Sequence, residues 1–177
     1  MKKPMKFAKY VLMACMAACL ALPASAEIEA WKLANQHKDM FRFSTLFTAG
    51  NVRDFLQSEE GLENAVDWCK KCGITHVYLE TFRGGYLVPW DMMQKAKTRF
   101  EDEGFQTSGC ITTVGIGKES VDGWIFPCFT EKGGLENLKH IFEYTAMQFD
   151  NVMVDDFFAT GCQCEECLEA KGDQSWA

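Results

Sequence analysis

Two kinds of site chemistry lie side by side in residues 151–167, which read NVMVDDFFATGCQCEEC. The apolar run Val152–Val154 ends directly in two carboxylates, Asp155 and Asp156. Carboxyl pairs hydrolyse glycosidic bonds because one group protonates the leaving oxygen while the other attacks or activates water. Adjacent residues of a strand point to opposite faces, so we expect one aspartate to face a pocket and the other to hold a loop or an arginine.

The cysteines that follow, Cys162, Cys164 and Cys167, form a C-x-C-x-x-C cluster whose sulfurs can converge on one point. Three close thiolates with a fourth from elsewhere suit tetrahedral zinc. Disulfides are the alternative, since an exported protein usually oxidises its thiols. Nine cysteines less the two before residue 27 leave seven, an odd number that cannot pair completely within the chain. Cys69 and Cys72 end a predicted helix, so we expect buried small side chains there rather than a redox pair.

These candidates must be positioned by the elements around them, and the chain reads as strands alternating with helices. Aromatic and β-branched runs bounded by turn residues predict four strands, over residues 41–47, 74–82, 105–113 and 152–154. Apolar residues at helical spacing predict three helices, which begin at Ser58, at Asp91 and near Leu135. Strict alternation indicates an α/β fold with a parallel sheet, because adjacent parallel strands need long crossover connections.

A (β/α) barrel and an open doubly wound sheet both satisfy this alternation. Polar residues at or just past the ends of all four strands favour the barrel, whose active sites draw on several strands: Thr48, Asn51, Glu80, Arg83, Thr112, Asp155 and Asp156. An open sheet would concentrate them at one switch point. No G-x-G-x-x-G or P-loop pattern follows a strand. A whole barrel takes about 250 residues, so we expect a partial (β/α)8 TIM barrel of about four β-α units.

Several residues at this edge are candidates for binding or catalysis. Glu80 is a third candidate catalytic carboxylate, with a salt bridge to Arg83 as the alternative. Arg83 and Asn51 are candidate substrate-binding residues, as is Trp124, because an aromatic ring can stack on a sugar face. Trp90 and Trp124 could equally cover the core.

The first 26 residues have the pattern of a signal peptide. Four lysines precede the apolar run Val11–Leu22, and Ala24–Ala26 is a small-x-small cleavage site. Lipidation at Cys15 or Cys19 is the less favoured alternative, because the apolar run continues past Cys19 and the cleavage site competes. We therefore expect an exported protein, periplasmic or secreted, with residues 27–177 as one domain.

Charge and length restrict the partners of that domain. Removing 1–26 leaves 14 basic against 25 acidic residues, a net charge of −11, which argues against nucleic acid and anionic membranes as partners. No later apolar run approaches the about 20 residues of a membrane-spanning helix. The remaining 151 residues suffice for a core.

Strand-end acids followed directly by C-x-C-x-x-C resemble the N-terminal half of a glycoside-hydrolase-type TIM barrel, in particular the zinc-cluster β-galactosidases. The resemblance covers residues 41–174. It implies a carbohydrate substrate and a zinc site of Cys162, Cys164 and Cys167 with Cys128 or Cys110 as fourth ligand. Those enzymes have Asn-Glu where this chain has Asp155 and Asp156, and their nucleophile comes from a later strand.

The function predicted from the sequence is therefore an exported glycoside hydrolase-like protein that acts on O-glycosyl bonds when complete. The alternative is a non-catalytic carbohydrate-binding or structural barrel fragment, in which a zinc or disulfide cysteine cluster is structural. A coding sequence that continues to another strand ending in Glu or Asp would favour the enzyme.

Overall fold

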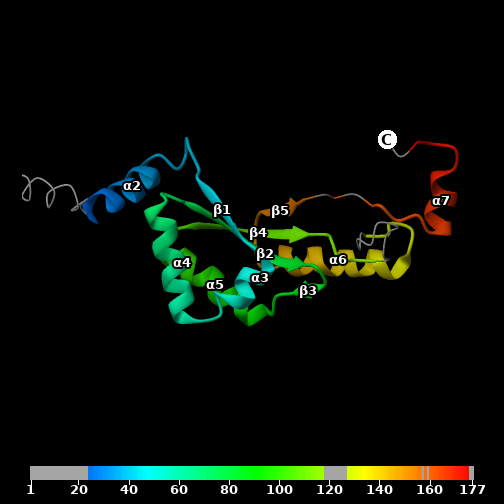
Figure 1. The fold of residues 1–177 in the computed structure, drawn as a ribbon, viewed down its shortest axis with the longest axis horizontal. Coiled ribbons are helices and arrows are strands. Elements are labelled where there is room, and N and C mark those ends of the chain that lie inside the picture. Colours follow the sequence, from blue (N-terminus) through cyan, green and yellow to red (C-terminus); the bar gives the residue numbers. More distant parts are fainter. Residues whose placement is uncertain (1–23, 118–126, 157, 159, 176–177) are drawn as a thin grey trace, which may run out of the picture.

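The computed structural model describes residues 24–117, 127–156, 158 and 160–175. The predicted leader therefore falls almost wholly outside the described residues, and so does Trp124. Helices and strands alternate along the chain (Figure 1), in the order α2 (Ala24–Gln36), β1 (Ser44–Phe47), α3 (Ala49–Asp54), α4 (Glu59–Lys71), β2 (His76–Arg83), β3 (Tyr86–Leu87), α5 (Trp90–Asp102), β4 (Gln106–Thr112), α6 (Lys132–Ala146), β5 (Val152–Asp155) and α7 (Glu165–Lys171).

The sheet confirms the predicted α/β class. Its described strands run in the order β1-β2-β4-β5, every neighbouring pair is parallel, and the short β3 adds an antiparallel pairing to β2. The four predicted strands are thus adjacent in sequence order. Their carboxyl ends lie along one edge, where Thr112 of β4 pairs with Asp155 of β5.

Helices α3, α4, α5 and α6 lie on one side of this sheet (Figure 1). On that side Val77 and Leu79 of β2 pack in a buried core with Val66, Met93 and Phe100 from the helices. Side chains alternate along a strand, so the other residues of β2 face the opposite side. None of the described helices is long and apolar enough to cross a membrane.

Helix α4 has the ends that the sequence predicted. The Ser58 side chain accepts a hydrogen bond from the Gly61 N–H at 3.0 Å, and Glu59 and Glu60 occupy the first turn, where the helix dipole favours negative charge. After the helix, Gly73 has φ +67°, a left-handed conformation that glycine adopts without steric cost.

The helix predicted near Leu135 exists as α6, but its buried face is rotated from the expected one. Leu135 and Ala146 were expected to point inward and are exposed, whereas Leu138, Ile141 and Thr145 are buried. A buried hydrogen bond explains the rotation: the Thr145 Oγ1 lies 2.6 Å from a threonine hydroxyl of β2 and donates to the Ile141 carbonyl at 2.8 Å. This polar pair fixes which side of α6 meets the sheet.

Two other segments differ from the sequence-based prediction. The expected polar arm over residues 27–40 is largely helix α2, which is held by the Trp31 ring 4.6 Å from the Phe105 ring. The strand expected to be buried is β5, yet Val152 and Val154 are 37% and 38% exposed. Within the described residues β5 pairs only with β4, so it is an edge strand.

Candidate functional site

Glu80, at the carboxyl end of β2, is a fully buried carboxylate held by several elements. Its Oε2 accepts the Ala49 N–H, the first of α3, at 2.8 Å, and its Oε1 accepts the Thr112 hydroxyl of β4 at 2.6 Å. The Arg83 Nε donates to both oxygens, at 3.0 and 2.9 Å. The salt bridge weighed as the alternative for Glu80 is therefore present, and Glu80 connects the ends of β1, β2 and β4.

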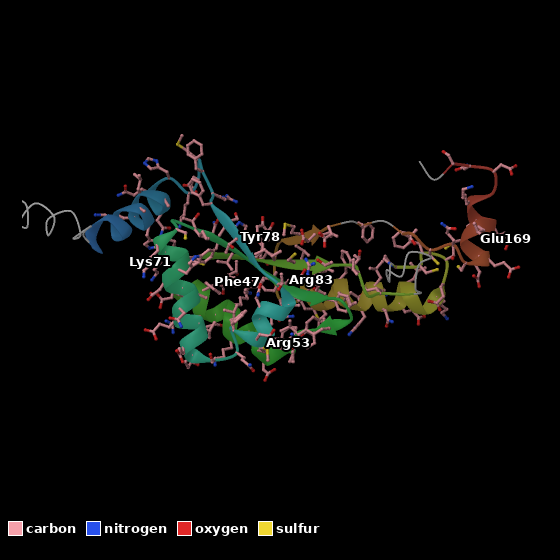
Figure 2. The ribbon with its side chains drawn as sticks, in the orientation of Figure 1. Phe47, Arg53, Lys71, Tyr78, Arg83 and Glu169 are labelled. Atoms are coloured by element: carbon pink, nitrogen blue, oxygen red, sulfur yellow. The ribbon has the colours of Figure 1, made fainter. Side chains whose placement is uncertain are left out.

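Arg83 continues this network to β5. Its Nη2 donates to Asp155 Oδ2 at 2.8 Å and its Nη1 to Asp156 Oδ2 at 3.3 Å. Figure 2 shows Arg83 where β2 and β5 end. Burial alone would lower the pKa of the guanidinium, but the hydrogen bond from Arg83 to Glu80 and the charges of Glu80, Asp156 and Asp155 outweigh it and raise the pKa. Arg83 is thus the cation shared by three carboxylates.

The backbone at Asp156 explains how two consecutive aspartates reach one arginine. Successive strand residues would point to opposite faces, as the sequence-based prediction assumed. Asp156 instead has φ +59° directly after β5 ends at Asp155. Aspartate is one of the few residues other than glycine that tolerates this left-handed region. The chain turns there, and both carboxylates meet Arg83.

Exposure separates the predicted acids into two groups. The side chains of Asp155 and Asp156 are 30% and 44% exposed, whereas that of Glu80 is 0% exposed. A solute can therefore touch the two aspartates, and in this arrangement it reaches Glu80 only through Arg83. Glu80 and Asp155 also lie within 4.8 Å of the Cys110 sulfur, but the Arg83 guanidinium already supplies the positive charge that a metal ion would bring.

The Cys110 thiol is excluded as fourth member of the cysteine cluster by its position beside these acids. Burial, with the charges of Glu80 and Asp155 adding to it, raises the pKa of Cys110 to about 12. The thiol therefore stays protonated near neutral pH. Of the two candidates for the fourth cysteine, Cys128 is the one that joins the cluster.

The sulfurs of Cys128, Cys162, Cys164 and Cys167 all lie within 4.8 Å of one another. The Cys128 Sγ is 3.8 Å from that of Cys164 and 3.7 Å from that of Cys167. A tetrahedral zinc with bonds of about 2.3 Å requires ligand sulfurs about 3.8 Å apart, whereas a disulfide requires about 2.05 Å. All four cysteines are free thiols, and this donor set fits a tetrahedral metal ion.

The thiols of the cluster have opposite proton affinities. Burial would raise the pKa of Cys128, but hydrogen bonds from the Thr130 side chain and backbone, from Cys162 and from the Glu131 N–H outweigh it and lower the pKa to about 6. Burial raises the pKa of Cys162 to about 12 and also raises that of Cys167. One thiolate therefore forms readily, as expected of the first ligand to meet a cation.

The other predicted binding residues lie away from Arg83. The Asn51 side-chain oxygen accepts the Thr48 N–H at 3.0 Å and the Thr48 hydroxyl at 2.9 Å, which makes it part of the capping box of α3. Trp90 is 44% exposed and its ring lies 5.6 Å from that of Tyr144. Trp124 lies outside the described residues. None of these side chains is placed against the carboxylates.

Sequence reasoning missed two groups of the site. The Ala49 N–H binds Glu80 because Thr48–Asn51, expected to be a turn, is the start of α3; the capping-box residues themselves were a usable signal. Thr130, whose hydroxyl contacts the cysteine cluster, carries no motif that marks it.

Fold and site together define an α/β protein with an acidic, arginine-linked site at the carboxyl edge of its parallel sheet. The chain belongs to the family described as "probable glycosyl hydrolase, catalytic domain", whose sequence profile matches residues 27–177. Among curated proteins it is similar to an uncharacterized protein of Saccharolobus solfataricus, with 30% identity over 130 residues that cover 71% of this chain and 22% of that protein. The chain thus spans about a fifth of the length of that relative.

Among solved structures, a hypothetical protein from Ruminiclostridium thermocellum aligns with a TM-score of 0.45 and 16% identity, over 62% of this chain and 74% of that one.

Proposed function

We propose that this chain is the N-terminal part of an exported glycoside hydrolase that cleaves O-glycosyl bonds of a carbohydrate. The observation that carries the proposal is the network of Glu80, Arg83, Asp155 and Asp156 at the carboxyl edge of the sheet, in a chain of the glycosyl hydrolase family. Glycoside hydrolysis needs positioned carboxyl groups. This network positions two that a solute can reach.

We propose further that the sheet is one half of a (β/α)8 barrel. In an open doubly wound sheet the strand order reverses and helices cover both faces. Here the strands follow one another in sequence order, and α3 to α6 lie on one side. Both features match a barrel, where helices form the outer ring. Strands that follow in the same protein would pair with the free edges of β1 and β5.

The network supports different roles for its members. Asp155 and Asp156 are the candidates to contact the sugar at the scissile bond, because their side chains are partly exposed. Glu80 is proposed to act on catalysis through Arg83, whose position it fixes. Arg83, 36% exposed, is free to touch a sugar hydroxyl on its open side. The second carboxyl group of the reaction is proposed to come from a later strand, as in the enzymes that the chain resembles.

The cysteine cluster is proposed to hold a structural zinc ion through Cys128, Cys162, Cys164 and Cys167. Four thiolates leave no open position for water, which is typical of structural rather than catalytic zinc. Bound zinc would cross-link the segment before α6 to the segment after β5. That link would hold the chain that leaves Asp156, and with it the aspartates, in place.

The test is hydrolysis of aryl glycosides and polysaccharides by two proteins: the 177-residue chain, and the full product of its reading frame in the source DNA. We expect the first to be inactive and the second to be active. Oligosaccharide binding without turnover by the full product would favour the non-catalytic alternative. Robust cleavage by the 177-residue chain would contradict the half-barrel. Export is tested separately, by an amino terminus at Glu27 in protein recovered outside the cytoplasm.

A further inference from the structure

Thr130 lies between Cys128 and α6, and its hydroxyl contacts the cysteine cluster. The Thr130 Oγ1 is 3.1 Å from the Cys167 sulfur, 3.4 Å from the Cys128 sulfur and 3.9 Å from the Cys164 sulfur. Cys167 is 37 residues along the chain, so the contact joins two segments. Figure 1 shows these segments, the start of α6 and helix α7, at the same end of the molecule.

Metal binding fixes the direction of this contact. In a free thiol either the sulfur or the hydroxyl can be the donor. A sulfur that binds a metal ion is a thiolate and has no proton to give, so the threonine hydroxyl must donate and the sulfur must accept. A hydroxyl has one proton, and the shortest distance directs that proton to Cys167.

The other sulfurs have their own donors. Cys128 accepts the backbone N–H groups of Thr130 and Glu131, and Cys162 accepts the backbone N–H of Cys164. Four thiolates around a divalent cation carry a net charge of −2, and hydrogen bonds to charged acceptors are stronger than those to neutral ones. A donor aimed at Cys167 therefore lowers the energy of the metal-bound state.

The turn that carries Thr130 is itself anchored. The Glu131 side chain caps α6 by accepting the N–H groups of Gly133, at 3.0 Å, and of Gly134. A Cβ on Gly134 would lie 3.1 Å from the Cys128 carbonyl oxygen, closer than most real contacts, so the turn packs closely on the helix start. The hydroxyl is thus held near Cys167 before a metal binds.

We propose that Thr130 is a positioning residue of the metal site, whose hydroxyl donates to the Cys167 thiolate and tightens the binding of zinc. This proposal rests on the proposed zinc site and not on glycosidase activity. Hydrogen-bond partners of metal ligands change metal affinity by about 10- to 100-fold when they are removed. The hydroxyl of one threonine belongs at the lower end of that range.

The experiment measures the dissociation constant of Zn²⁺ on the full chain by competition with a chromophoric chelator under reducing conditions. Thr130→Val keeps the shape and removes the hydroxyl, Thr130→Ser keeps the hydroxyl, and Thr98→Val, on an exposed position of α5, is the matched control. We expect about tenfold weaker binding for Thr130→Val and values near wild type for the other two. The thiolate-to-Co²⁺ charge-transfer band of the cobalt-loaded protein should shift only in Thr130→Val.

The outcomes separate this inference from the zinc site itself. A wild-type protein that binds no zinc overturns both. A wild-type protein that binds zinc as tightly as Thr130→Val overturns only the role of the hydroxyl. Weak binding by Thr130→Ser as well as Thr130→Val would also overturn it, because the methyl packing would then be the cause. A circular dichroism spectrum of the zinc-loaded variant that matches wild type shows that the fold is kept.

Discussion

Arg83 Nη2 lies 2.8 Å from Asp155 Oδ2, and this contact joins the ends of β2 and β5, two strands that are separated in the sheet by β4. The same guanidinium binds Glu80, which is buried, and Asp156, which is partly exposed. One cation thus connects the interior of the sheet edge to the carboxylates that a substrate can reach. Changes to Arg83 should affect both stability and the candidate site.

Arg83→Met should destabilise the protein because it leaves the Glu80 carboxylate buried without its cation. Loss of one partner of a buried pair costs about 3–5 kcal/mol, and the partial exposure of Arg83 reduces this to about 2–3 kcal/mol. Urea unfolding measures the loss. Arg53→Met, which removes an exposed ion pair with Asp54, is the control and should leave the midpoint unchanged.

The double variant Glu80→Gln with Arg83→Met sharpens this test. Removal of both charges leaves no unpaired carboxylate, so the double variant should be more stable than the sum of the two single changes predicts. Strict additivity, or an Arg83→Met protein as stable as wild type, would contradict the view of Arg83 as the counter-ion of Glu80.

In the complete protein, Asp155→Asn and Asp156→Asn should identify the carboxylate that acts on the sugar. Loss of a positioned general acid or base lowers turnover by about 10²–10⁴-fold, and we expect a loss of this size in at least one of the two variants with the melting temperature preserved. Steady-state hydrolysis of an aryl glycoside is the measurement, with the exposed Asp150→Asn as the control. Unchanged turnover in both variants would remove these residues from the mechanism.

Cys164→Ser should abolish metal binding. Purified under mild reducing conditions, the wild-type protein should carry about one zinc per molecule, and the variant should carry almost none because the serine hydroxyl is a poor replacement for a thiolate. Elemental analysis by mass spectrometry makes the comparison. Cys72→Ser changes an exposed cysteine outside the cluster and should keep the metal. A disulfide among Cys162, Cys164 and Cys167 in zinc-free protein would support the oxidised alternative.

His76 should make the protein less stable at acid pH. Burial, together with the charge of Arg42, lowers the pKa of His76 in the folded state, while the unfolded chain keeps a value of about 6.5. Above that value both states are neutral. Below it the unfolded state binds the proton first, so stability falls as the pH drops from about 6.5 toward the folded pKa.

The measurement is the urea midpoint of wild type and His76→Gln at pH 7.5, 6.5 and 5.5. Glutamine can keep the hydrogen bond that His76 Nε2 makes to Ser108 at 2.8 Å but does not titrate. The variant should therefore lose less stability than wild type between pH 6.5 and 5.5. The exposed His140→Gln should follow wild type. Parallel profiles for wild type and His76→Gln would show that this histidine is not the sensor.

Local features of the fold followed from the sequence alone. Ser58 and Gly73 bound α4 as predicted, because a cap hydroxyl and a left-handed glycine act through backbone groups a few residues away. The alternation of strands and helices also fixed the parallel sheet, since crossover length is a local property of the chain. The same reasoning placed Glu80, Arg83, Asp155 and the cysteines at strand ends or in the turns that follow them.

Only the tertiary structure decided how these residues are combined. The rotation of α6 depends on a hydroxyl pair across 64 residues, which no local pattern contains. The choice of Cys128 over Cys110 depends on which loop passes the C-x-C-x-x-C turn. The convergence of both aspartates on Arg83 depends on the left-handed backbone at Asp156. Sequence determines which groups stand at an edge, whereas distances between edges are set by packing, and hydrogen bonds and charges act over those distances.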